Sequence, residues 1–188
     1  MNDKPASGTT PSQTVGPYFH LGLCDPWSVS CLAGPDVKGE RVRLTCRVLD
    51  GNGYPVDDSM IEIWQADAQG EYAKPTSTSS CPGFGRMGVA PDGTCTFETI
   101  KPGRVPGPGN SLQAAHLNVM VFARGLLRHL NTRIYFAGDA ALEADPVLML
   151  VPEDRRYTLL AQPDLSREGA WRFDIHLRGE HETVFFDV

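Results

Sequence analysis

The polar residues best suited to chemistry in this chain fall along one strand-like stretch, residues 116–124. His116, Asn118 and Arg124 lie on the same face of this stretch, because side chains alternate along a strand. Residues i and i+2 on one strand face lie within about 7 Å of each other. Two histidines at that spacing could bind one metal ion. Here asparagine occupies the second position, and the expected pair is incomplete.

Tyr72 is a further possible metal donor, since its phenolate could bind a ferric ion. It ends a turn at residues 67–72, and a single loop tyrosine usually packs against its neighbours. A lone buried histidine such as His116 is likewise more often hydrogen-bonded structure than a ligand. Two donors are too few for a tight mononuclear site. The residue types alone therefore favour structural roles for both.

Arg124 ends the same stretch beside Gly125. A guanidinium at a strand end can form a bidentate pair with a carboxylate, including that of a ligand. It can equally form an ordinary ion pair at the protein rim. Spacing alone leaves these two interpretations open.

Short alternating segments separated by turns must position these residues. The chain contains 19 glycines and 15 prolines, which favour turns and short strands over long helices. Strand patterns occur at residues 41–50, 60–66, 93–100, 116–124, 132–136, 157–161, 170–177 and 183–187. A short helix is expected at 139–145 and an extended loop at 73–92. This pattern predicts an all-β fold: a single antiparallel β-sandwich domain, residues 14–188, with long Pro/Gly-rich loops.

The N-terminus divides into a polar leader and an arm. Residues 1–13 are expected to be flexible. Residues 14–40 form the arm and a following loop, and the arm contains Tyr18 and Phe19, two large aromatic residues that favour burial. The arm either lies along its own domain or docks on a partner chain.

Charge, cysteine content and missing motifs exclude several functions. A net charge of −6 does not indicate binding to nucleic acid or to an anionic membrane. Five cysteines without a C-x-x-C pattern argue against a disulfide framework and favour a reducing cytoplasm. No export signal is visible. Nucleophile-elbow, phosphate-loop and H-E-x-x-H patterns are absent from the sequence.

Several segments together resemble the intradiol ring-cleavage dioxygenases. The most specific are TPSQTVGPYF at 10–19, EIWQADAQGEY at 62–72 and AAHLNVMVFARG at 114–125. The family resemblance implies a β-sandwich and non-haem Fe(III) held by two tyrosines and two histidines. Tyr72 and His116 match one ligand of each kind, whereas Val105 and Asn118 stand where the other two are expected. An aliphatic side chain and an amide do not replace a phenolate and an imidazole for Fe(III), so these four positions mark a vestigial metal site.

The resemblance is greatest to the alpha-type chain of a two-chain enzyme, which binds no metal itself. It implies that a related beta-type partner holds Fe(III) and that alpha–beta pairs build a larger oligomer. The substrate implied is protocatechuate, cleaved with O2 between its two hydroxyl-bearing carbons to 3-carboxy-cis,cis-muconate. Thr14, Gly16 and Pro17 of the arm, together with Arg124, are then expected to wall the partner's substrate pocket.

Two alternatives remain at this point. One is a self-sufficient intradiol catechol dioxygenase with an unusual set of ligands. The other is a β-sandwich scaffold module without any part in catalysis. Iron content of the chain alone distinguishes the first, and the effect of replacing Arg124 distinguishes the second.

Overall fold

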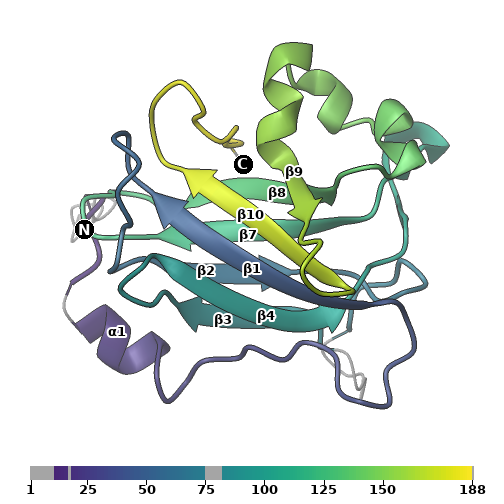
Figure 1. The fold of residues 1–188 in the computed structure, drawn as a ribbon. Coiled ribbons are helices and arrows are strands. Elements are labelled where there is room, and N and C mark those ends of the chain that lie inside the picture. Colours follow the sequence, from purple (N-terminus) through teal and green to yellow (C-terminus); the bar gives the residue numbers. More distant parts are fainter. Residues whose placement is uncertain (1–10, 17, 75–81, 188) are drawn as a thin grey trace, which may run out of the picture.

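Two β-layers packed face to face make up the computed structural model, which describes residues 11–16, 18–74 and 82–187 (Figure 1). The expected all-β sandwich is confirmed. Pro17 and most of the leader expected at 1–13 lie outside the described residues. Within the part that is described, no helix has the length and apolarity needed to span a membrane.

Among the described residues the helices are few and short, and ten strands form the framework. The strands are β1 (Arg41–Leu49), β2 (Met60–Trp64), β3 (Phe84–Gly88), β4 (Thr94–Ile100), β5 (Val105–Pro106), β6 (Leu112–Gln113), β7 (His116–Phe122), β8 (Leu130–Phe136), β9 (Leu160–Pro163) and β10 (Ala170–His176). The helical segments are α1 (Tyr18–Leu23) and the 3-10 turns η1 (Pro108–Asn110), η2 (Ala140–Ala144), η3 (Leu148–Leu150) and η4 (Glu153–Leu159).

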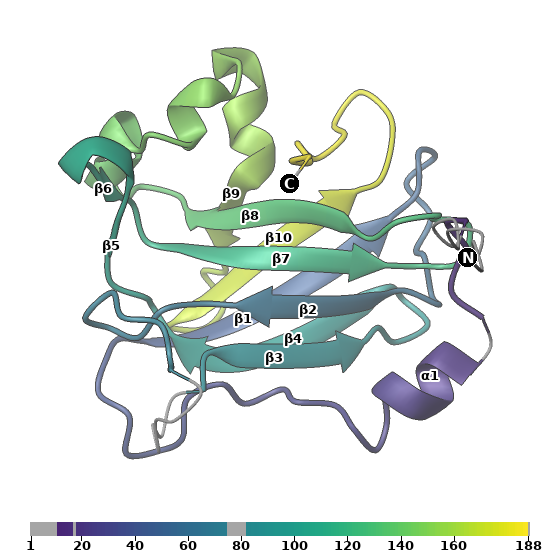
Figure 2. The same ribbon diagram turned by 180° about the vertical axis from the view of Figure 1, so that it is seen from behind.

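Eight strands form one continuous hydrogen-bonded order, β3-β2-β7-β8-β9-β10-β1-β4. The short strand β9 joins the two layers, because it pairs with β8 on one side and β10 on the other. The β8–β9 and β1–β10 pairs are parallel, and the remaining pairs are antiparallel. Figure 2 shows β2, β3, β7 and β8 in the near layer, with β1, β4 and β10 behind them.

The core lies between the layers and follows the alternation of the sequence. Leu117, Val119 and Val121 of β7 are buried, and they join a cluster that includes Leu44 of β1 and Phe173 of β10. Burying one such side chain is worth about 1.5–3 kcal/mol. The inward set on β7 thus fixes its register and sends His116, Asn118 and Phe122 to the opposite face.

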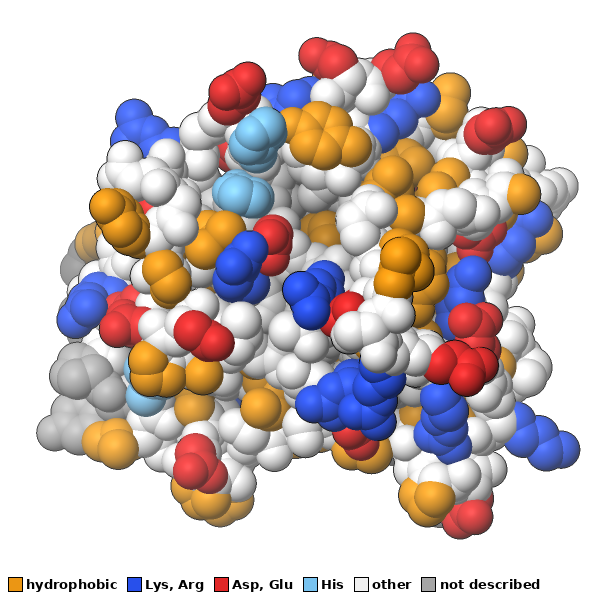
Figure 3. Space-filling model, viewed as in Figure 1, with side chains coloured by type: hydrophobic (Ala, Val, Ile, Leu, Met, Phe, Trp, Pro, Cys, Tyr) orange, Lys and Arg blue, Asp and Glu red, His pale blue; other side chains and the backbone are white. Residues whose placement is uncertain are grey.

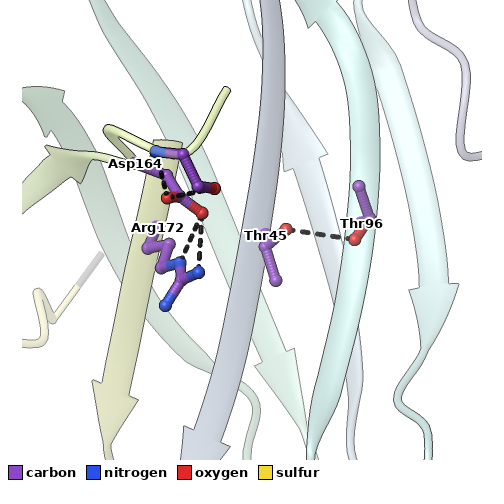
Figure 4. Close-up of polar contacts among 5 residues, drawn as sticks. Thr45, Thr96, Asp164 and Arg172 are labelled. Carbon is purple, nitrogen blue, oxygen red and sulfur yellow. Dashed lines mark hydrogen bonds and ion pairs between the residues drawn. The ribbon is translucent and has the colours of Figure 1, made fainter. Parts of the chain in front are cut away.

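The outer face of β1, β4 and β10 is polar. Figure 3 shows basic and acidic side chains interspersed over this face. In Figure 4 the Asp164 carboxylate accepts hydrogen bonds from Arg172, with Nη2 2.7 Å from Oδ2, and the hydroxyls of Thr45 and Thr96 lie 3.2 Å apart across β1 and β4. Ion pairs at a protein surface add little stability each, and this polar face is consistent with contact with solvent.

Three local expectations were wrong. The C-terminal segment at 183–187 is not a strand: it makes one bridge to β8, between Asn131 and Phe186. Only the last part of the strand expected at 157–161 exists, since η4 extends to Leu159. The loop expected at 73–92 contains β3, whose two glycines gave no apolar alternation in the sequence. The helix expected at 139–145 is present as η2.

Candidate functional site

His116 begins β7 and is 3% exposed. Its Nδ1 donates to the carbonyl oxygen of Ala114 over 2.8 Å, and its ring lies 5.8 Å from that of Tyr135 on β8. Burial lowers the pKa of His116, and the nearby Arg133 cation lowers it further. Both effects favour the neutral imidazole.

The start of β7 is held in place by a buried carboxylate. Asp145 is fully buried, and its Oδ2 accepts the Ala114 N–H over 2.7 Å. Its Oδ1 accepts the Tyr135 hydroxyl over 3.1 Å and the backbone N–H groups of Val147 and Leu148. Tyr135 has a raised pKa, chiefly because it is buried. This carboxylate fixes the strand end that carries His116.

Tyr72 and Asn118 are in direct contact. Asn118 Nδ2 donates to the Tyr72 hydroxyl over 3.0 Å, and the Tyr72 ring stacks on Trp64 with 6.2 Å between ring centroids. The turn before Tyr72 is stabilised by Asp67, whose Oδ1 accepts two backbone N–H groups. Gly70 completes this turn with φ +83°, where a Cβ would lie against the Arg104 carbonyl.

Val105 and Arg133 are connected through Gln113 to the region of the expected metal-site positions. Val105 is 4% exposed and pairs with Gln113 across β5 and β6. Gln113 in turn accepts a hydrogen bond from Arg133 Nη1 over 2.7 Å. Arg133 is the β8 partner of Asn118, so that a guanidinium lies next to the expected metal position. Arg133 was not predicted from the sequence, because the sequence does not determine the register between the strands at residues 116–124 and 132–136.

These residues do not fit Fe(III). Asn118 contributes an N–H donor toward Tyr72 where a metal needs a lone pair, and Val105 offers no donor at all. The cation of Arg133 would also repel a metal ion. Among the described residues, no group of three or more His, Cys, Asp or Glu side chains could hold a metal. Hydrogen bonds within the protein, and not metal ligation, are what this set of side chains supports.

The second group of candidate residues lies at the other end of β7. Thr14 of the arm accepts the Gly125 N–H through Oγ1 over 2.7 Å, and Arg124 precedes that glycine. Gly16 accepts the Phe19 N–H over 3.0 Å at the start of α1. The structure thus brings Thr14 next to Arg124, although 109 positions separate them in the printed sequence.

Arg124 is exposed, with 77% of its side chain accessible, and its Nε lies 2.9 Å from Asp58 Oδ2. The ion pair that the sequence left open is therefore present. Its closest contact is at Nε, which shares one edge of the guanidinium with one Nη group, while the two Nη groups together form the outer edge. Asp58 immediately precedes Ser59 and β2, and the sequence alone gave no sign of its pairing with Arg124.

The arm lies on its own domain through two further contacts. Phe19 packs near Phe122 of β7, with ring centroids 5.8 Å apart. His20 Nε2 donates to the Asp58 carbonyl oxygen over 2.9 Å. Beside the arm lies an open cavity of about 610 Å³. It is lined by the arm, the β7–β8 loop and the C-terminal segment, including Val15, Leu127, His129 and Phe186.

The expected metal-site positions on β7 and Arg124 lie at opposite ends of this strand. β7 extends from His116 to Phe122, a span of about 20 Å, and Arg124 lies in the turn that follows the strand. Figure 2 shows the same separation, with β5 and β6 beyond one end of β7 and α1 near the other. Any role of Arg124 with a substrate is therefore independent of the Tyr72–Asn118 contact in this chain.

Comparison with known proteins gives one consistent result. A family model described as "Dioxygenase" matches residues 15–179. The alpha chain of protocatechuate 3,4-dioxygenase from Pseudomonas putida is 44% identical over 192 residues, covering 95% of this chain and 96% of that one. The beta chain from Burkholderia cepacia is 35% identical over 158 residues, covering 77% and 67%.

A solved structure supports the same assignment. The dioxygenase domain of a dioxygenase–carbohydrate-binding protein fusion from Streptomyces sp. SirexAA-E superimposes with a TM-score of 0.65 and 27% identity. The match covers 92% of this chain and 99% of that one. Fold, motifs and relatives agree, and the chain belongs to the intradiol ring-cleavage dioxygenase family.

Proposed function

We propose that this chain is the alpha subunit of a two-chain protocatechuate 3,4-dioxygenase. The assembly would use O2 to cleave protocatechuate between its hydroxyl-bearing carbons, giving 3-carboxy-cis,cis-muconate. The similarity to an alpha chain runs along nearly the whole sequence, and the weaker similarity to a beta chain is that of a related partner. Both support a subunit of such an assembly over a self-sufficient enzyme.

The observation that carries the proposal is the meeting of the arm with Arg124. Thr14 holds the backbone of Gly125, and Gly16 follows two residues later in the arm. These are residues expected to wall a partner's pocket, and Thr14 contacts Gly125, the neighbour of the exposed Arg124. Pro17, the remaining expected wall residue, lies between Gly16 and α1 in the chain.

Arg124 would act by charge and direction. Protocatechuate is a carboxylate at neutral pH, and a guanidinium is protonated at every physiological pH. The two Nη groups of Arg124 could donate a bidentate pair of hydrogen bonds to that carboxylate, which would both attract the substrate and limit its orientation. This chain would thereby contribute binding and orientation to a reaction completed by its partner.

The Fe(III) of the assembly is assigned to the beta subunit, because the donor set around Tyr72, Val105, His116 and Asn118 does not fit a metal. We further propose that residues 14–40 dock on the beta subunit, that alpha–beta pairs assemble into a larger oligomer, and that the assembly works in the cytoplasm, as the cysteine pattern suggests. Leu127, 61% exposed beside the arm, is an apolar residue suited to such an interface.

Expression of the chain with and without a beta-type partner tests the proposal. Iron content and O2 consumption with protocatechuate are measured for the chain alone, the partner alone and the co-purified complex. The chain alone is expected to hold no stoichiometric iron and to show no activity. Stoichiometric iron together with turnover in the chain alone would instead identify a self-sufficient dioxygenase.

A further inference from the structure

We infer that Asp58 is a positioning residue, which orients the Arg124 guanidinium toward the substrate carboxylate. The inference rests on the proposed function of Arg124 and adds to it a residue outside the arm and β7. Its basis is the contact between Arg124 Nε and Asp58 Oδ2, 2.9 Å long, between a largely exposed arginine and an aspartate whose side chain is 24% exposed.

The contact leaves the outer edge of the guanidinium available. Arginine presents five N–H donors in a planar fork, and a carboxylate is bound bidentately by two parallel N–H groups. The ion pair with Asp58 favours the rotamers that keep Nε near this carboxylate, and in these rotamers the edge formed by the two Nη groups points away from Asp58. An exposed arginine without such a contact would sample many rotamers and lose that freedom on binding.

Asp58 itself stands on a well-fixed segment. The next residue, Ser59, is fully buried, and its N–H and hydroxyl both donate to the Val56 carbonyl, over 3.2 and 2.8 Å. The backbone carbonyl of Asp58 also accepts the hydrogen bond from His20 of α1 over 2.9 Å. One residue therefore links the helix of the arm, through its carbonyl, to Arg124, through its carboxylate.

The two links are chemically separable. Asp58→Asn removes the negative charge from the side chain but keeps the backbone carbonyl that holds His20. Asp57→Asn makes the same change of charge one residue earlier, at an exposed side chain. Asp57 is therefore a matched control for any general effect of charge on substrate attraction.

The test is a double-mutant cycle in the co-purified alpha–beta complex. KM and kcat for protocatechuate are measured for Asp58→Asn, Asp57→Asn and Arg124→Ala, and for each asparagine variant combined with Arg124→Ala. Asp58→Asn is expected to raise KM about two- to fivefold, the range of an exposed ion pair, with kcat nearly unchanged. In the Arg124→Ala background, Asp58→Asn should have no effect on KM. In the parent background, Asp58→Glu keeps the negative charge and should therefore have a KM close to that of the parent chain.

Three results would overturn the inference. An equal rise of KM in both backgrounds would show that Asp58 acts on the fold, not through Arg124. An equal rise with Asp57→Asn would assign the effect to general charge. A fall of KM would show that Asp58 merely neutralises Arg124. If Arg124→Ala alone changed nothing, the proposed function of Arg124 would fail first, and this result is distinct from the other three.

Discussion

Replacing Asp145 by asparagine is expected to destabilise the fold by about 2–4 kcal/mol, although the two side chains have nearly the same size. Asp145 is fully buried and accepts four hydrogen bonds, through Oδ2 from the Ala114 N–H and through Oδ1 from Tyr135, Val147 and Leu148. All four partners are donors. An asparagine has one oxygen, so its NH2 group must face at least one of them.

The magnitude follows from the better of the two amide orientations. With the oxygen at the Oδ1 position, three bonds survive without the assistance of charge, which roughly halves their strength. The NH2 group then opposes the Ala114 N–H and leaves it unsatisfied, at a cost of about 1–3 kcal/mol. Removing a buried charge recovers some desolvation energy, and this keeps the total below the sum of the separate losses.

Urea unfolding of the chain, followed by tryptophan fluorescence and circular dichroism, measures this difference. With a slope of about 2 kcal/mol/M, the midpoint should fall by roughly 1–2 M. Asp154→Asn, at an exposed position with the same change of charge, is the control and should shift the midpoint by less than about 0.3 M. An equally small shift for Asp145→Asn would refute the argument from four converging donors.

Acid stability and thiol reactivity give two further predictions. Burial raises the pKa of the Asp139 carboxyl, but the Ala141 N–H and the Lys101 ammonium outweigh it and hold that pKa below its usual value. The stability contributed by this carboxylate is therefore present above its unfolded pKa of about 3.9 and is lost as the pH falls through the lower folded pKa. The free energy of unfolding of Asp139→Asn should accordingly depend less steeply on pH below about pH 4. Burial also raises the pKa of Cys95 to about 12, so mass-spectrometric mapping after iodoacetamide treatment at pH 8 should find exposed Cys31 modified and Cys95 modified only after unfolding. Early labelling of Cys95, or equal acid midpoints for Asp139→Asn and the parent, would contradict these expectations.

Local patterns predicted much of the fold. The alternation around Val42 and Leu117 reports which face is buried, and both strands formed as expected. Strand β3 was missed because FGRMG contains two glycines and has no apolar alternation. The expected strand at 183–187 failed because a run of β-formers does not by itself supply a partner strand beyond one bridge.

For the candidate site, too, the sequence predicted some features and not others. The identities of Tyr72, His116 and Asn118 were readable in the sequence, whereas their contacts depend on tertiary structure. Asp58 and Arg133 could not be identified from the sequence. Asp58 pairs with Arg124, which is distant in sequence. Arg133 lies opposite Asn118, and the sequence did not determine the register of these two strands. Residue types could therefore suggest which groups matter, but only the fold shows which charges meet.

The most direct test of the account compares two substrates in the alpha–beta complex. KM is measured for protocatechuate and for catechol, which lacks the carboxylate, with Arg124→Ala and with the parent chain. Losing a charge-assisted hydrogen bond costs about 1.5–3 kcal/mol, so KM for protocatechuate should rise about tenfold or more, while KM for catechol stays nearly constant. Unchanged KM and kcat for protocatechuate, or an equal rise for both substrates, would contradict a role for Arg124 in binding the carboxylate.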